Sequence, residues 1–597
     1  MASDWAQLKH KRLGKAPLAS TSSSSARPPP PPPTSSARPN PPPAPAATTP
    51  PVAFSHPHLP SSLEVRTLPR RGRGIVAKAA FQPGQTLVTT APLVSALDNL
   101  HYSSRCSSCY RAADDLDSAL PPARRKLLQC SLCHVVQYCT PQCQKRDWPV
   151  HKHECAALRN AANATAGNKP VPDTPVRALG RLLWTSEVKG NDLWTQVESL
   201  ESHRTRLSPE EQERFFHLSI ALAQYVGQET LKRACPDAAA VLDLCSRFAA
   251  NSFALTAPTD LSNLGVSISP LTALFNHSCA PNAVVVFPSF PSSPSTSRHM
   301  HVVALRPIQP GDEVVTSYVD LALPRDVRQK ELRERYKFEC GCEACEGGGE
   351  GQAVDPREAL ACPRAKEGCE GLIRLPDRDS TVTSVTCPTC RTTSSYKSVH
   401  AALDAAKLAF ADAEESQYKE PHVAALHLQH LLTSLTAPLD STPALAPSAF
   451  PVLPALQLLL TLQLHASSFP AALSTARLAL KGAQHLYAPG HPVRALVRTT
   501  LVRLETMPPP QDAAHPDAET RYWSDVRARE GALEALVGAL REVEVAFGDG
   551  GTGAVKGGEM AKMLRDLISD QEQGIVVGRR IRAAAVEEQR RVRTLQR

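Results

Sequence analysis

The sequence lacks the long apolar run that a membrane-spanning helix requires. Its start, Met1-Ala2-Ser3-Asp4-Trp5, has no apolar stretch of the kind found in secretory signals, so we expect none. No nucleophilic triad motif is present. The net charge of +8 is small for 597 residues and gives no reason to expect direct nucleic-acid binding. These absences favour a soluble protein of the nucleus, the cytoplasm or both, which we expect to be a monomer.

What the sequence does contain is enough apolar material for large cores and an unusual set of cysteines. Hydrophobic residues make up 42% of the chain, and its length predicts several domains. Many of the 17 cysteines form Cys-x-x-Cys pairs. Without an export signal, such pairs indicate metal binding rather than disulfides.

Residues 1–62 form a low-complexity segment. The serine run 22–25 and the proline run 28–33 cannot build a packed core, so we predict a disordered arm with polyproline II character. Two interpretations remain open: a passive tail, or a ligand for SH3- or WW-type domains.

The most informative stretch is Leu274-Phe275-Asn276-His277-Ser278-Cys279-Ala280-Pro281-Asn282, followed by the apolar run 283–287. The apolar run predicts a short buried strand. The polar residues before it are costly to bury unless each has a partner. For the Asn-His pair alone, a capped turn entering a strand is a sufficient explanation.

Three other motifs change that interpretation. Residues 302–318 predict a strand, a tight turn and a second strand that ends at Tyr318. Residues 336–345 contain a Cys-x-Cys-x-x-Cys cluster, and residues 71–77 place a glycine pair before a strand. Together, in this order, the motifs resemble the SET domain of protein lysine methyltransferases.

A block between residues 106 and 155 narrows the resemblance. Its potential zinc ligands are Cys106, Cys109, Cys130, Cys133, Cys139, Cys143, His151 and Cys155. Eight sulfur and nitrogen ligands suffice for two tetrahedral zinc sites. The block resembles a MYND finger, so the chain is similar to the SET–MYND family. We interpret the long gap between Cys109 and Cys130 as a surface loop.

The MYND resemblance implies interleaved ligand sets. One zinc would take Cys106, Cys109, Cys139 and Cys143, and the other would take Cys130, Cys133, His151 and Cys155. His153 competes with His151, but only His151 matches the family spacing. The finger could be structural or could bind proline-rich partners.

Two further zinc sites are expected. Cys279 with Cys340, Cys342 and Cys345 supplies four thiolates. Cys362, Cys369, Cys387 and Cys390 predict a fourth site, for which the alternative is two unrelated thiols beside a two-cysteine turn. The expected cofactors are therefore S-adenosylmethionine and three or four zinc ions.

The remaining segments are predicted to be helical. Residues 156–250 show helical periodicity and would form an insert within the SET fold. From about residue 400 the chain predicts antiparallel helix pairs that are TPR-like, without a strict repeat of roughly 34 residues. The arginine-rich end is either a solvated helix or tail, or a phosphate-binding segment.

The expected fold class is multi-domain α+β: a mainly-β SET fold split by a MYND finger and a helical insert, then an all-α TPR-like domain. The predicted divisions are 1–62 (arm), 63–105 (SET, first part), 106–155 (MYND finger), 156–250 (insert), 251–320 (SET catalytic core), 321–346 (post-SET zinc segment), 355–395 (extra zinc knuckle), 396–545 (helical domain) and 546–597 (Gly-rich linker and basic tail).

The resemblance implies that S-adenosylmethionine binds at residues from each motif. These are Arg71, Gly72, Arg73, Gly74, Asn251, Asn276, His277, Tyr318 and Phe338. Tyr318 would orient the amine and the methyl group, Tyr336 would form a wall of the lysine channel, and Phe338 would stack on adenine. Tyr318 and Tyr336 are thus the expected catalytic residues.

The resemblance implies a protein-lysine N-methyltransferase whose substrate is a lysine of a histone or another protein. Two alternatives stay open. One is a weak or inactive SET–MYND scaffold that regulates transcription through protein interactions. The other is a MYND-type adaptor that binds proline-rich peptides, in which the finger alone would retain the main activity.

Overall fold

The computed structural model describes residues 56–116, 126–164, 171–291, 297–346, 353–436, 444–507, 525–549 and 555–595. Most of the predicted arm and part of the loop after Cys109 therefore lie outside the described residues. Residues 56–62, assigned to the arm above, are described and pack on the body: Leu63 donates its N–H to the carbonyl of Pro60, and Lys78 donates to that of Ser62. Within the described residues, no helix is long and apolar enough to cross a membrane.

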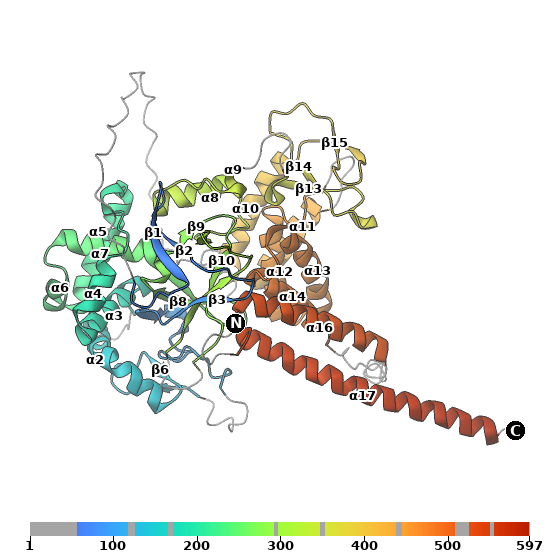
Figure 1. Cartoon of the computed structure of the whole chain (residues 1–597), viewed down its shortest axis with the longest axis horizontal. Helices are drawn as coiled ribbons and strands as arrows, with labels where there is room; N and C mark the ends of the chain where they lie inside the picture. The colour runs from blue at the N-terminus through green and yellow to red at the C-terminus, as the bar shows by residue number, and fades with distance from the viewer. Residues whose placement is uncertain are drawn as a thin grey trace.

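Three small sheets lie at the centre of the molecule (Figure 1). The first has the order β1 (Leu63–Leu68), β2 (Gly72–Ala77), β12 (Glu313–Thr316) and β9 (Asn276–His277). The second has the order β10 (Ala283–Val286), β11 (Met300–Ala304) and β3 (Thr86–Thr90). The third has the order β4 (Val94–Leu97), β8 (Asn263–Ile268) and β7 (Ser252–Thr256).

The first sheet brings the distant sequence motifs together. β2 pairs with β12 antiparallel, with Ile75 opposite Val314, and β12 pairs with β9 in parallel, with Thr316 opposite His277. The predicted strands are confirmed, although the last one ends at Thr316 and Tyr318 lies just beyond it. The glycine hairpin and the Asn276-His277 pair therefore belong to the same sheet.

A finger and a helical layer interrupt this β core, as expected. The finger contains β5 (Leu128–Gln129), β6 (Gln137–Tyr138) and α2 (Pro141–Ala164). The insert contains α3 (Thr174–Lys189), α4 (Asn191–Glu198), α5 (Pro209–Val226), α6 (Gln228–Ala234) and α7 (Ala238–Asn251). α5 begins at a capping box, in which Ser208 accepts from the N–H of Glu211 and Glu211 accepts from that of Ser208. The apolar faces of the insert helices pack on β4 and β8.

The second half of the chain is mainly helical. α8 (Arg325–Glu331) and a π-helical turn (Leu332–Tyr336) precede α9 (Glu343–Glu346). Two hairpins follow, formed by β13 (Ala359–Ala361) with β14 (Leu372–Arg374) and by β15 (Ser384–Thr386) with β16 (Thr393–Ser395). The region predicted as the helical domain contains α10 (His400–Ser416), α11 (Pro421–Thr436), α12 (Val452–His465), α13 (Phe469–Leu486), α14 (Pro492–Glu505) and α16 (Val526–Phe547). The region predicted as the tail contains α17 (Gly558–Leu595).

The last two helices are part of the body rather than an appended tail. Val286 and Val303 of the second sheet share one buried cluster with Val543 and Phe547 of α16 and with Leu564 of α17. Only the far end of α17 projects beyond its neighbours (Figure 1). The boundary expected near residue 546 therefore does not separate a folded domain from a tail, because α17 starts inside the core.

Replacing Leu564 by alanine tests this packing. Leu564 is fully buried, so the substitution should leave a cavity and cost about 2–5 kcal/mol of stability. The midpoint of thermal unfolding of the full chain, followed by circular dichroism, should fall by several degrees. Val576 lies further along the same helix and is 48% exposed, so Val576→Ala should leave the midpoint nearly unchanged. Equal midpoints for the two variants would show that α17 is not part of the core.

Candidate active site and metal centres

A cavity of about 740 Å³ opens where the first sheet meets the helical insert and the segment after α8. Most of the predicted active-site residues line it. They are Arg71, Gly72, Arg73, Asn251, Asn276, His277, Tyr318, Tyr336 and Phe338. This volume lies within the usual range of small-molecule sites. Gly74 is the exception: it does not line the cavity.

The glycines of the β1–β2 hairpin have different tasks. Gly72 has φ of +69°, a conformation that side chains disfavour, and it forms the turn at the edge of the cavity. A Cβ at Gly74 would lie 2.7 Å from Nδ2 of Asn276 and 2.8 Å from Oε1 of Glu313. Gly74 therefore allows the polar side chains of the facing strands to approach the hairpin.

Glu313 organises this edge of the cavity. Its carboxylate accepts a hydrogen bond from Nδ2 of Asn276 at 2.8 Å and forms an ion pair with Nε of Arg71 at 3.1 Å. Arg71 also donates from Nη2 to the carbonyl oxygen of His277 at 2.9 Å. Charged hydrogen bonds of this kind are stronger than neutral ones, so they fix the hairpin against β9. The sequence prediction did not single out Glu313.

The hydroxyl of Tyr318 is held in one orientation. It donates to the carbonyl oxygen of Phe275 at 2.6 Å, and the backbone N–H of Tyr318 donates to Nδ1 of His277 at 2.9 Å. Burial raises the pKa of Tyr318, with smaller contributions from Tyr336 and Glu313. The phenol is therefore neutral near pH 7, and its oxygen lone pairs remain available for a ligand.

Tyr318, Tyr336 and Phe338 form an aromatic group beside the cavity. The rings of Tyr318 and Tyr336 lie 4.9 Å apart, and Phe338 meets Tyr318 edge-on at 6.4 Å. Burial raises the pKa of Tyr336 to about 12. Both phenols are thus uncharged, and their ring faces can attract a cation.

The insert contributes residues that the sequence analysis missed. Leu200, Glu201, His203 and Arg206, in the loop between α4 and α5, line the cavity. Asn251 holds this loop, because its Nδ2 donates to the carbonyl oxygen of Glu201 at 2.9 Å. The loop carries no motif, so only its position in the fold reveals it.

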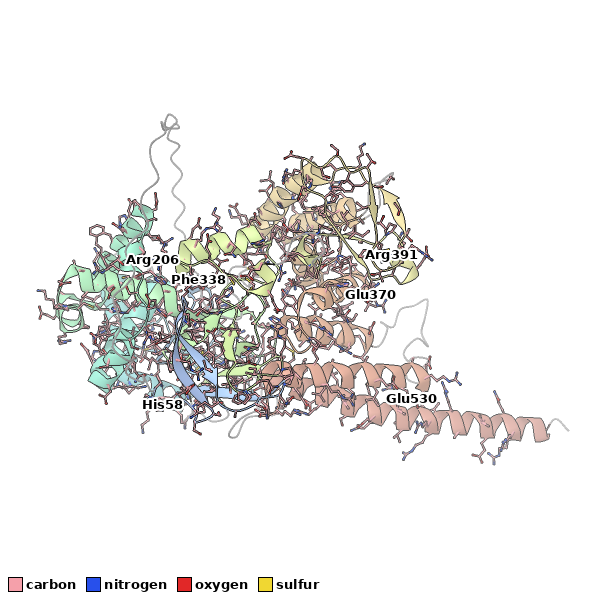
Figure 2. The ribbon with its side chains drawn as sticks, turned by 45° about the horizontal axis from the view of Figure 1, so that its top comes forward. His58, Arg206, Phe338, Glu370, Arg391 and Glu530 are labelled. Carbon is pink, nitrogen blue, oxygen red and sulfur yellow. The ribbon has the colours of Figure 1, made fainter. Side chains whose placement is uncertain are left out.

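The same loop is joined to the segment that carries the aromatic residues. Arg206 donates to the carbonyl oxygen of Lys337, and Nζ of Lys337 lies 2.6 Å from Oε2 of Glu211. Figure 2 shows Arg206 and Phe338 next to each other above the central sheets. The cavity is therefore closed by contacts between two segments far apart in sequence.

All four predicted zinc-ligand sets come together. In each set, the four ligand atoms lie within 4.8 Å of one another. The sets are Cys106, Cys109, Cys139 and Cys143; Cys130, Cys133, His151 and Cys155; Cys279, Cys340, Cys342 and Cys345; and Cys362, Cys369, Cys387 and Cys390. Individual Sγ–Sγ distances such as 3.4 Å between Cys362 and Cys390 are close to the edge of roughly 3.8 Å expected for a tetrahedron of thiolates about 2.3 Å from zinc. His151, rather than His153, joins its set.

Comparisons with known proteins agree with this geometry. Residues 72–319 match the SET domain family. The chain is 31% identical over 290 residues to the N-lysine methyltransferase SMYD2 of Gallus gallus, a match covering 48% of this chain and 60% of that protein. It is 28% identical over 454 residues to the histone-lysine N-methyltransferase ASHR1 of Arabidopsis thaliana, covering 74% and 86% of the two chains. Residues 72–319 thus match a SET domain, and the chain is similar to SET–MYND proteins. The histone-lysine N-methyltransferase SMYD3 of Mus musculus is 28% identical over 289 residues, covering 48% of this chain and 61% of the relative. The chain thus spans about three fifths of the length of the two vertebrate relatives.

The third potential ligand set lies at the cavity, which Cys340 and Cys342 help to line. Nδ1 of His277 accepts a hydrogen bond from Tyr318, so the neutral ring carries its proton on Nε2. That nitrogen lies 3.3 Å from Sγ of Cys279, where the N–H can stabilise a thiolate. Sγ of Cys279 lies 3.5 Å from that of Cys345. One ligand set consequently fixes β9 to the segment that bears Tyr336 and Phe338.

The predicted MYND finger is anchored to the insert by buried charges. Glu154 lies 3.3 Å from Nδ1 of His151 and forms ion pairs with Arg181 and with Arg177, 3.5 Å away. Burial would raise the pKa of Glu154, but Arg181 and His151 outweigh it and the pKa is lowered. An ionised carboxylate behind a histidine ligand fixes the tautomer that presents Nε2 to the metal. The sequence analysis missed Glu154, although its position three residues after His151 on one helix was a usable signal.

Metal analysis tests the ligand sets. Purified protein should contain four zinc ions per chain, one for each set. Replacing Cys387 by serine should lower the content to three, because a tetrahedral site without one thiolate binds zinc far more weakly. Cys245 is buried but belongs to none of the sets, so Cys245→Ala should keep four. An unchanged zinc content in Cys387→Ser would rule out the fourth site.

Proposed function

We propose that this protein is an S-adenosylmethionine-dependent protein-lysine N-methyltransferase. The observation that carries the proposal is that Tyr318, Tyr336 and Phe338 line the same cavity as the Gly72 hairpin and the Asn276-His277 pair. The relatives of the chain are N-lysine and histone-lysine methyltransferases, which supports the same activity. The substrate is a lysine side chain of a histone or another protein.

The residues around the cavity fit the cofactor. The turn at Gly72 leaves its backbone open to a ligand, since no Cβ covers it. Arg71 and Arg73 supply positive charge for a carboxylate, Asn251 and Asn276 supply amides, and half-buried Phe338 supplies a ring face for a base. When bound, S-adenosylmethionine supplies a sulfonium methyl group that an amine can accept.

The protein must present the lysine amine neutral and aligned. Free lysine has a pKa of about 10.4, and an apolar, buried channel disfavours the ammonium form. Tyr318 cannot serve as a general base at neutral pH, because its own pKa is raised. Tyr318 instead positions the amine. Its O–H donates to the carbonyl oxygen of Phe275, so its oxygen can accept a hydrogen bond from the amine N–H and thereby direct the nitrogen lone pair.

Tyr336 has a different part in the same channel. Its ring packs at 4.9 Å from that of Tyr318 and its hydroxyl is buried among the residues that line the cavity. An aromatic wall of this kind attracts a cationic or methylated amine. The space around its hydroxyl then limits how many methyl groups the amine can carry.

The variant Tyr318→Phe tests the proposal. It keeps the ring and removes the hydroxyl, so cofactor affinity and zinc content should remain normal. The hydroxyl acts mainly in the transition state, and turnover should fall by about 100-fold or more. The rate of methylation of a lysine-containing peptide in a single turnover measures the chemical step. Calorimetry measures the affinity for the cofactor separately. Normal turnover would mean that the active site is elsewhere.

Tyr336→Phe should change the product rather than the rate. Removing this hydroxyl enlarges the channel or removes a hydrogen bond from the amine, so the distribution of mono-, di- and trimethyl-lysine should shift. Mass spectrometry of the methylated peptide over time measures this distribution. If the product distribution equals that of the unmodified protein and turnover falls strongly, Tyr336 aligns the amine for transfer instead of limiting the number of methyl groups.

An inactive scaffold is the competing function, and calorimetry separates it from the enzyme. The intact ring cluster and the hairpin at Gly72 favour binding of the cofactor. A scaffold that had lost the activity would show no binding of S-adenosylmethionine or S-adenosylhomocysteine to the full chain. An adaptor acting through its finger would keep its partner binding when Tyr318 is replaced by phenylalanine.

A further inference from the structure

The segment just before the SET fold reaches the cofactor cavity. His56, the first described residue of the chain, lines this cavity with residues of the β1–β2 hairpin and the insert loop. Its side chain is 6% exposed, whereas that of His58, two residues later, is exposed. No SET or MYND motif contains His56.

The hydrogen bonds of His56 define which of its nitrogens is a donor. The backbone N–H of His58 donates to Nδ1 of His56 at 3.3 Å. Burial, followed by the charge of His58, lowers the pKa of His56, so the ring is neutral near pH 7. A neutral imidazole whose Nδ1 accepts carries its proton on Nε2.

Nε2 of His56 is buried and has no hydrogen-bond partner among the described residues. Leaving a buried donor unpaired is costly, which predicts an acceptor that arrives from the cavity. The side chain of Gln196 raises the pKa of the ring, but no atom of Gln196 meets hydrogen-bond geometry with Nε2. The ring is therefore poised to donate to a bound ligand.

The surroundings of His56 indicate an anionic acceptor. The ring interacts with the side chain of Gln196. The backbone carbonyl oxygen of Gln196 accepts a hydrogen bond from Oγ of Ser199 at 2.7 Å. Arg73 donates to the backbone carbonyl of the same Ser199. His56 and Arg73 thus approach one turn at the end of α4 and line the cavity together, with Arg70 as a further cation. A carboxylate is the acceptor that such a group of donors would bind most strongly.

We propose that His56 binds the carboxylate of the cofactor's amino-acid end through its Nε2–H. The proposal rests on the proposed function, because it assumes that S-adenosylmethionine occupies the cavity. It adds a binding residue from outside the SET and MYND motifs, and it makes the junction of the arm part of the site. Residues 1–55 are not required for this contact, whereas residues 56–62 are.

Calorimetry with two ligands tests the proposal on the full chain. S-adenosylhomocysteine carries the carboxylate, and 5′-methylthioadenosine lacks the amino-acid end. His56→Ala should weaken binding of the first about tenfold or more, as expected for losing a hydrogen bond to a charged group, and should leave binding of the second unchanged. His58→Ala should change neither affinity, because the backbone N–H that contacts His56 remains.

Two further variants separate a lost hydrogen bond from a damaged fold. His56→Gln places an amide N–H near the position of Nε2 and should restore most of the affinity for S-adenosylhomocysteine. A chain that begins at residue 56 should bind like the full chain, and one that begins at residue 63 should bind like His56→Ala.

The outcomes distinguish the two levels of the proposal. If the unmodified chain binds neither ligand, the proposed function fails. If the unmodified chain binds both ligands, and His56→Ala lowers the two affinities equally or lowers neither, the proposed function stands. The carboxylate contact of His56 is then overturned. The unfolding midpoint without ligand should be the same for His56→Ala and His58→Ala, which excludes a general loss of structure.

Discussion

Four cysteine sulfurs from two separate segments lie within 4.8 Å of one another, and the candidate active site depends on that constraint. Cys279 follows the Asn276-His277 pair, whereas the other three lie in the segment 340–345. Four thiolates at this separation repel one another unless a metal ion neutralises them. A metal held by these four sulfurs would fix the segment that bears Tyr336 and Phe338 beside Tyr318. His277 couples the two halves, because one ring nitrogen accepts from Tyr318 and the other meets Cys279.

The cavity has three walls, and each is supported by a different part of the chain. The β1–β2 hairpin is held by Glu313, the insert loop by Asn251, and the segment after α8 by the thiolate set and by Lys337. Behind the aromatic group, Tyr318 and Tyr336 share a buried cluster with Leu453 and Tyr487 of the helical domain. A site assembled from several separately supported parts holds its residues in fixed positions. The proposed methyl transfer requires this, because that reaction depends on alignment of the reactants.

Much of this arrangement followed from local sequence. The paired cysteines predicted all four ligand sets, because tetrahedral sites impose short, recognisable spacings within each half of the set. The apolar run after Asn282 predicted β10, and the helical periodicity of residues 156–250 predicted the helices of the insert, among them α5. The roles of Glu313, Glu154 and the α4–α5 loop escaped prediction, because a single charged residue or a polar loop carries no spacing that distinguishes it from ordinary surface.

The sequence by itself predicted the SET domain, the four sets of potential zinc ligands, the order of the elements and most residues of the cavity, because each depends on motifs with local spacing. The tertiary structure alone decided how the parts meet. It showed that Gly74 makes room for Asn276 and Glu313 rather than lining the cavity, and that α17 begins in the core beside Phe547. It also placed His56, with its unpaired Nε2, in the cavity wall. These facts depend on which distant surfaces pack together, and that packing has no signature in any short stretch of the chain.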